Sequence, residues 1–299
     1  PGQEGTDKKY DGYADGTPHS LALTANEKAT IAAAKRICDK VVLVSESAAP
    51  MELAPVMSGE LEVDAILWIS QVGERGFSVV DDILCGDVNP SGRTVDIFAT
   101  DFTKDPTYQN FGSYHYDNAT VTVSSFGNVP TAPDGTNYRT FVEYQEGIYM
   151  GYRYYETADA VDEAFVYGEL DGAGAVLTPG AVAYPFGYGL SYTTFEQEIT
   201  DFSDFGDDIT LTVEVKNTGD AAGKEVVQVY YTSPYTKYDA ENGIEKSATV
   251  LAAFAKTEEI PAGGSASVTL TFAKEDMASY SYAHQNKDGT RGCYILEAG

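Results

Sequence analysis

Three residue types that often carry chemistry are scarce in this sequence of 299 residues, which has three cysteines, three histidines and one tryptophan. The cysteines Cys38, Cys85 and Cys293 are odd in number, and their spacing matches no metal-binding pattern. The histidines are scattered and include no His-x-x-x-His pair. We therefore expect neither a metal site nor a histidine-based hydrolase triad. Because Cys38 and Cys85 sit in apolar helical contexts, we expect both to be buried thiols.

Positive charge and long hydrophobic runs are also scarce. The sequence has 19 basic and 46 acidic residues, which gives a formal net charge of −27. Such a surface repels phosphate backbones and anionic lipids, so nucleic acid and membranes are poor partners, whereas neutral substrates are compatible with it. No apolar run approaches the roughly 18 residues of a membrane span. Without a signal peptide or an initiator methionine, we expect a processed or trimmed N-terminus. Localisation stays open between cytoplasm and secretion, and we favour the bacterial cytoplasm.

The first hundred residues alternate as an α/β domain does. Thr24 and Glu27 form a capping box at the start of a helical pattern. Short apolar runs at 41–46 and 64–70 predict buried strands. Residues 75–86, which follow the second run, predict a helix that ends at Gly86. A third strand is expected from Arg93 onward. Strands and helices with short connections predict a mainly parallel sheet flanked by helices.

Residues 100–145 carry little periodicity, and we expect a long loop there, which in a compact domain is usually functional or mobile. Tyr108, Tyr114 and Tyr116 are candidates for substrate binding at an active-site rim. The tyrosines at 149, 152, 154 and 155 are expected to pack around the sheet instead. Gly187-x-Gly189 predicts a turn and not a phosphate cradle, since no helix follows it. We expect no cofactor.

From about residue 205 the pattern is all-β. Leu211, Val213 and Val215 alternate onto one face, and further short runs follow that are separated by turn signals such as NTGDAAG and PAGGS. This spacing predicts a small β-sandwich.

Four motifs then resemble one family, the family 3 glycoside hydrolases, and they occur in that family's order. The four are GDVNPSGR (86–93), YQEGIYMGYRYYE (144–156), YPFGYGLSYTTF (184–195) and VEVKNTGDAAGKEVVQVYY (213–231). The resemblance implies an α/β sandwich domain over residues 1–195 and a fibronectin-III-like β-sandwich over residues 196–299. It covers nearly the whole chain.

The resemblance also gives a role to the first residues of the chain. In many members the general acid/base glutamate lies in a loop of the form G-E-G-x-D-R, which Gln3 to Lys8 resembles except at its first and last positions. By that similarity Glu4 is the acid/base, and Asp7 is a structural residue that caps the turn. The family's nucleophile is an aspartate in a (β/α)8 barrel, for which this chain is too short.

The resemblance therefore implies part of a retaining β-glycosidase, most simply a β-glucosidase that hydrolyses terminal β-D-glucosyl residues with two carboxyl groups. This chain would supply the acid/base, and a barrel in the same polypeptide or in a second chain would supply the nucleophile. The substrate would be an oligosaccharide or an aryl or alkyl β-glycoside. A homo-oligomer of the chain is compatible with this interpretation. Two alternatives stay open: a β-xylosidase of the same family, and a non-catalytic accessory or carbohydrate-binding protein. An exposed apolar face on the α/β domain would favour the enzyme part over the accessory protein.

Overall fold

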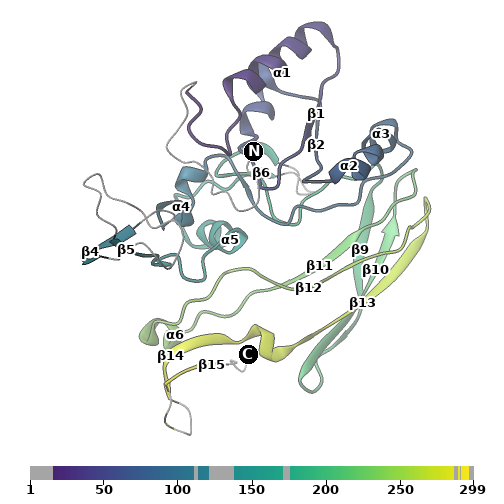
Figure 1. The fold of residues 1–299 in the computed structure, drawn as a ribbon. Coiled ribbons are helices and arrows are strands. Elements are labelled where there is room, and N and C mark those ends of the chain that lie inside the picture. Colours follow the sequence, from purple (N-terminus) through teal and green to yellow (C-terminus); the bar gives the residue numbers. More distant parts are fainter. Residues whose placement is uncertain are drawn as a thin grey trace.

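The computed structural model describes residues 16–110, 114–120, 138–170, 176–285, 289 and 291–295. Its N-terminal part mixes short helices and strands, and its C-terminal part is built mainly of long strands (Figure 1). The helical elements of the first part are α1 (Ala25–Ile37), η1 (Ala54–Val56), η2 (Gly59–Leu61), α2 (Gly73–Gly76), α3 (Ser78–Cys85), η3 (Phe102–Lys104), α4 (Pro106–Asn110) and α5 (Tyr152–Val161). Its strands are β1 (Val42–Ser45), β2 (Ala65–Trp68), β3 (Phe98–Ala99), β4 (Tyr114–Thr120), β5 (Tyr138–Phe141), β6 (Gly168–Leu170), β7 (Val176–Pro179) and β8 (Val182–Tyr184).

The local signals at the start of the chain are confirmed. The Thr24 side chain accepts a hydrogen bond from the Glu27 backbone at the start of α1, and the Glu27 carboxylate accepts one from the Thr24 backbone at 2.7 Å. Strands β1 and β2 pair in parallel, with Val42 opposite Ala65. Helix α3 ends at Gly86, whose φ of 85° lies in the left-handed region that favours glycine. The α/β class of this part is thereby confirmed.

The predicted third strand is only two residues long in the structure. β3 pairs antiparallel with β8. Among the described strands, β1 and β2 are therefore the pair that runs parallel. Two apolar clusters lie on either side of this short strand. Phe98 packs in the first with Leu53 and Val56, and Ala99 packs in the second with Tyr155 and Val182. The expectation that the tyrosines of residues 149–155 pack around the sheet is confirmed for Tyr155, which is buried in the second cluster.

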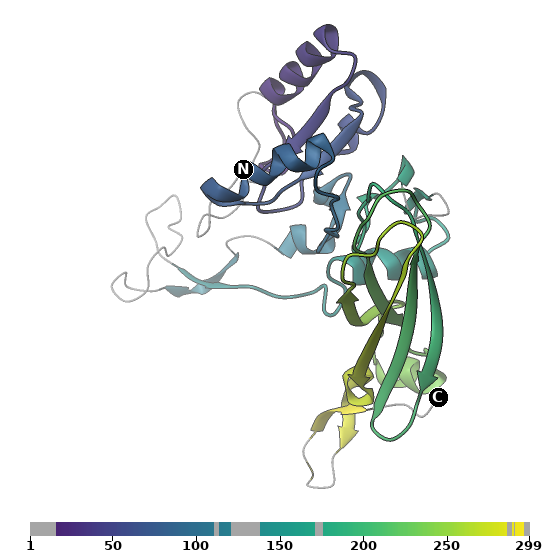
Figure 2. The same cartoon turned by 90° about the vertical axis from the view of Figure 1, so that its right-hand side faces the viewer.

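The expected long loop at residues 100–145 is wrong in part, because regular elements interrupt it. η3 and α4 follow β3, and β4 pairs with β5 in an antiparallel hairpin that extends away from the rest of the molecule (Figure 2). Tyr114 and Tyr116 alternate along β4, and both rings pack against Phe141 of β5. Such cross-strand aromatic pairs stabilise a hairpin. The alternating tyrosines were therefore the strand signal in this polar segment.

The C-terminal part is a sandwich of antiparallel strands, as predicted. β9 and β13 flank β10 in one sheet, β11 pairs with β12, and β14 pairs with β15. Leu211, Val213 and Val215 of β10 all face the core between the sheets, where Val227 of β11 meets them. The elements are β9 (Phe195–Ser203), β10 (Asp208–Asn217), β11 (Val226–Tyr231), α6 (Lys237–Asn242), β12 (Val250–Lys256), β13 (Ser265–Ala273), η4 (Lys274–Met277), β14 (Ser279–Gln285) and β15 (Arg291–Ile295).

The prediction of buried thiols is wrong, because Cys38 and Cys85 are both exposed. The physical reason is their place at helix ends: Cys38 caps the C-terminus of α1, and Cys85 is the last residue of α3. The residues that these helices bury are Ile31 and Val80, farther from the ends. Separately, among the described helices none is long and apolar enough to cross a membrane.

Asn217 at the end of β10 holds the turn of the NTG segment through all of its side-chain hydrogen-bonding groups. The side chain is fully buried. Its oxygen accepts from the Thr193 hydroxyl at 2.7 Å and from the Gly219 backbone at 3.1 Å. Its nitrogen donates to the Ala221 carbonyl at 2.8 Å and to the Ile260 carbonyl at 2.9 Å. An amide makes four such bonds at most, so this residue is saturated.

Replacing Asn217 by aspartate is expected to destabilise the sandwich strongly. A carboxylate cannot donate, so the carbonyls of Ala221 and Ile260 lose a partner and a charge is buried, at a cost of at least about 2 kcal/mol. Denaturant unfolding measures the loss. The matched control is Asn26→Asp on the exposed first turn of α1, which should shift stability by less than about 0.5 kcal/mol. Equal midpoints for the two variants would show that the Asn217 network is not important.

Candidate functional site

Glu4 and Asp7, the predicted acid/base and its capping neighbour, lie outside the described residues. Their roles therefore stay predictions. The three candidate tyrosines are described, and the structure places them in two separate environments. Tyr108 lies on α4 and lines a cleft together with Tyr152 and Phe186. Tyr114 and Tyr116 lie on the extended hairpin, where both are partly exposed and both contact Phe141.

His19 is buried, and its contacts are structural. Its Nδ1 accepts a hydrogen bond from the Leu21 backbone at 3.2 Å, so Nε2 carries the proton that points to Glu52 Oε1 at 3.0 Å. Glu52 also accepts from the Phe102 backbone at 2.7 Å, which ties the N-terminal segment to the start of η3. Within the described ranges no group of three or more histidine, cysteine, aspartate or glutamate side chains is placed to hold a metal ion.

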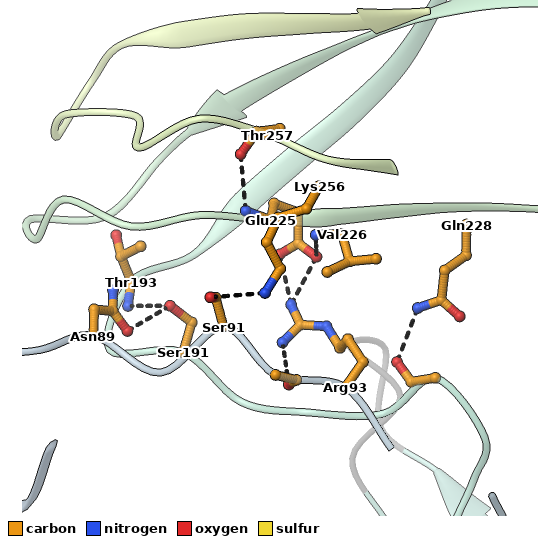
Figure 3. Close-up of polar contacts among 12 residues, drawn as sticks. Asn89, Ser91, Arg93, Ser191, Thr193, Glu225, Val226, Gln228, Lys256 and Thr257 are labelled. Carbon is orange, nitrogen blue, oxygen red and sulfur yellow. Dashed lines mark hydrogen bonds and ion pairs between the residues drawn. The ribbon is translucent and has the colours of Figure 1, made fainter. Parts of the chain in front are cut away.

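A cluster of polar side chains joins the two parts of the chain (Figure 3). Arg93, from the NPSGR motif, donates from Nη2 to Glu225 Oε1 at 2.7 Å and to Oε2 at 2.8 Å. Their side chains are only 13% and 10% exposed, so the charges are largely desolvated. Glu225 Oε1 also accepts from the Val226 backbone at 2.8 Å, at the first residue of β11. A partly buried, multiply hydrogen-bonded guanidinium–carboxylate pair thus fixes the α/β part on the sandwich.

Asn89 of the same motif reinforces this contact. Its oxygen accepts from the Ser191 hydroxyl at 2.9 Å and from the Tyr192 backbone at 2.8 Å, and its nitrogen donates to the Ala222 carbonyl at 2.9 Å. Lys256 of β12 donates to Ser91 at 3.2 Å. One short loop therefore contacts three segments that are distant in sequence (Figure 3).

The glycines of the PFGYG motif are required by close approach at the same junction. Gly187 has a φ of 76°, and a Cβ there would come within 2.1 Å of the Gln228 side-chain oxygen. A Cβ on Gly189 would lie 2.3 Å from the Gly92 carbonyl oxygen. Gln228 in turn donates to the Gly187 carbonyl at 3.0 Å. The turn predicted at Gly187-x-Gly189 therefore belongs to the contact between the two parts, which is a structural role.

Three of the four motifs seen in the sequence thus meet at one place, which we call the junction: residues 86–93, 184–195 and 213–231. The sequence indicated each motif but not that they touch. The signal for it was the presence of an arginine in one motif and a glutamate in another, with few other basic residues available. The junction explains these motifs by packing and hydrogen bonding and supplies no reacting group.

The comparisons with known proteins agree with this organisation. Residues 2–152 match the family model described as the glycosyl hydrolase family 3 C-terminal domain. The chain belongs to glycosyl hydrolase family 3. Residues 225–299 match the fibronectin type III-like domain. The resemblance drawn from the motifs and the predicted fold class are confirmed. Neither match reaches residues 153–224, so the domain boundary after residue 195 stays a prediction.

Curated relatives are similar to nearly the whole chain. It is 31% identical to beta-glucosidase A of Butyrivibrio fibrisolvens over 93% of its length, and 29% identical to a beta-glucosidase of Ruminococcus albus over 94%. It spans only 29% and 24% of those relatives.

Solved family 3 structures share the fold. A beta-glucosidase from Paenibacillus barengoltzii superposes with a TM-score of 0.72 at 30% identity, covering 98% of this chain and 26% of that one. Beta-glucosidase 3B of Thermotoga neapolitana, solved in complex with glucose, superposes with a TM-score of 0.68 at 30% identity, covering 95% of this chain and 33% of that one.

Removing Arg93 is expected to loosen the junction. Arg93→Ala leaves the Glu225 carboxylate desolvated without its cation, which costs about 3 kcal/mol in comparable buried pairs. Arg93→Lys should recover only part of this, because a lysine has no second nitrogen to replace Nη1, which donates to the Gly92 carbonyl at 3.2 Å. Denaturant unfolding of the single variants and of the Arg93→Ala, Glu225→Ala double variant gives the coupling energy.

Lys104→Ala is the control, because Lys104 forms an exposed pair with Asp101 at 3.5 Å. Its loss should change stability by less than about 0.5 kcal/mol. Strictly additive effects of Arg93→Ala and Glu225→Ala would contradict the role assigned to the pair.

Proposed function

We propose that this chain forms part of a retaining β-glucosidase-type glycoside hydrolase. The observation that carries the proposal is the similarity of nearly the whole chain to proteins named as beta-glucosidases, in sequence and in fold. In such an enzyme one carboxyl group protonates the leaving group and a second attacks the sugar, with the two about 5–5.5 Å apart. This chain would supply the first group, and a (β/α)8 barrel would supply the second.

Glu4 is the residue proposed for the acid/base role. Its support is the similarity of residues 3–8 to the family's acid/base loop, together with the match of residues 2–152 to the family 3 C-terminal domain. The acid must hold a proton when the glycosidic bond breaks and must accept one from water in the second step. Proximity to the anionic nucleophile would raise its pKa before the first step, and neutralisation of that nucleophile by glycosylation would lower it again.

The surface of the α/β part supports a large partner in the same assembly. Phe77, Val79, Leu84 and Val88, on and around α3, are each at least 40% exposed. Several exposed apolar side chains on one short segment favour an interaction site there. It favours the enzyme part over the alternative of a free-standing accessory protein, whose surface would be polar. The preference for a glucoside over a xyloside as substrate rests on the names of the relatives, which are beta-glucosidases.

The test of this proposal is Glu4→Gln in the polypeptide that carries this chain together with its barrel. Glutamine cannot donate the proton, so hydrolysis of an alkyl β-glucoside, a substrate with a poor leaving group, should fall about 10²–10⁴-fold in kcat/KM. Glycosylation by a 2,4-dinitrophenyl glucoside should fall much less, because that leaving group needs no proton. Steady-state kinetics with both substrates measure the difference.

Glu60→Gln is the matched control, since Glu60 is exposed on η2, and it should leave both substrates unaffected. Full activity of Glu4→Gln on the alkyl glucoside would refute the acid/base assignment. Absence of glucosidase activity in the parent polypeptide would refute the proposed function itself.

A further inference from the structure

The cleft that contains Tyr108 lies beside the carboxyl end of β1. Its volume is about 570 Å³, within the range of about 300–1,000 Å³ typical of small-molecule sites. Ala49 and Pro50, from the loop after β1, form one side, and Val95 to Ile97, leading into β3, form another. In open α/β sheets, ligands bind outside the carboxyl ends of the strands. The position therefore suits a binding site.

One wall of the cleft is aromatic and held in place by contacts behind it. Tyr152 stacks on Phe186 with ring centroids 4.6 Å apart, and both line the cleft. The Tyr152 hydroxyl accepts a hydrogen bond from the Leu251 backbone of β12 at 3.0 Å, which fixes the ring against the sandwich. Tyr108 and Met150 complete the apolar lining. This wall is preformed, so a ligand would not have to order it.

The polar lining consists of Asp96, Asp105 and Thr107. Asp105 is satisfied within the fold: it accepts from the Thr107 backbone at 2.9 Å and from the Tyr155 hydroxyl at 3.3 Å. Asp96 is not. Its Oδ1 accepts from the Ile97 backbone at 2.8 Å, but no described residue donates to Oδ2. Gly151, whose φ of 52° lies in the left-handed region that favours glycine, is close to this carboxylate.

The electrostatics of the cleft disfavour an anionic ligand and suit one that donates hydrogen bonds. Among the described residues that line it there is no lysine, arginine or histidine, so an anionic ligand has no partner. Desolvation, with a smaller contribution from the charge of Asp105, raises the pKa of Asp96. Asp96 is nevertheless exposed, so a hydroxyl donor can reach its carboxylate in place of water.

We propose that this cleft binds one pyranose ring of a neutral sugar, with Asp96 accepting from its hydroxyls and the aromatic wall covering its apolar face. A pyranose presents both chemistries, donors at its rim and C–H groups on its face. The choice of glucose as that sugar rests on the proposed function, but binding itself does not require Glu4 or a barrel. The site would hold a sugar unit by its own contacts and contributes no reacting group.

The experiment is a titration of the ¹⁵N-labelled 299-residue chain with D-glucose, followed by amide chemical shifts in an amine-free buffer. Saturable shifts at residues 95–97, 105–108 and 150–152 are expected, with a Kd in the millimolar range. Asp96→Ala and Tyr108→Ala should each weaken binding at least tenfold. Asp201→Ala and Tyr282→Ala, at exposed positions on β9 and β14, should leave Kd unchanged. Unfolding midpoints and the unshifted amides of all four variants verify that the fold is intact.

Three results would overturn the proposal: no saturable shift with glucose, shifts that lie outside the cleft, or an unchanged Kd in the Asp96 and Tyr108 variants. Preferential binding of a polyhydroxylated amine such as tris(hydroxymethyl)aminomethane over glucose would also overturn it, because the site would then select a cation. The proposed function is tested separately by hydrolysis in the parent polypeptide. Glucose binding without hydrolysis would refute the function alone, and hydrolysis without binding in this cleft would refute this inference alone.

Discussion

The arrangement of the two parts depends on the contact of Arg93 with Glu225. Two desolvated charges with two hydrogen bonds between them leave little freedom of orientation, and the Glu225 backbone position is itself fixed where β11 begins. Asn89, Lys256 and Gln228 add hydrogen bonds around this pair, each between segments distant in the sequence. A sandwich attached in this way is a rigid support for the α/β part, unlike a domain on a flexible linker.

The same contact explains why the strongest sequence motifs are not the catalytic ones. Gly187 and Gly189 are glycines because neighbouring atoms occupy the space of a side chain, and Asn217 is an amide because the turn offers two carbonyls and two donors. Requirements of this kind tolerate almost no other residue. They identify the family clearly, but they report on how the parts are joined and not on the reaction.

Local features were predictable from the sequence where one short segment determines them. The capping box at Thr24, the glycine stop at Gly86 and the alternation of Leu211, Val213 and Val215 each depend on near neighbours, and the structure has all three. Features that depend on distant residues were not predictable. The burial of Cys38 and Cys85 depends on what covers the helix ends, and the environment of Tyr108 depends on Tyr152 and Phe186, which lie far along the chain. The antiparallel pairing of β3 with β8 is of the same kind.

The scarcity of positive charge connects the junction with the cleft. With 19 basic residues against 46 acidic ones, most carboxylates must be satisfied by water, by hydroxyls or by backbone amides. The desolvated cations that are available go to structural pairs: Arg93 to Glu225 and Lys246 to Asp239, at 2.7 Å and 3.0 Å. Asp96 receives none: it is exposed at a largely apolar cleft, and partial desolvation there raises the pKa of its carboxyl group. A carboxylate in this state can accept hydrogen bonds from a neutral molecule that brings its own hydroxyl donors, and an acidic surface around it does not repel such a molecule.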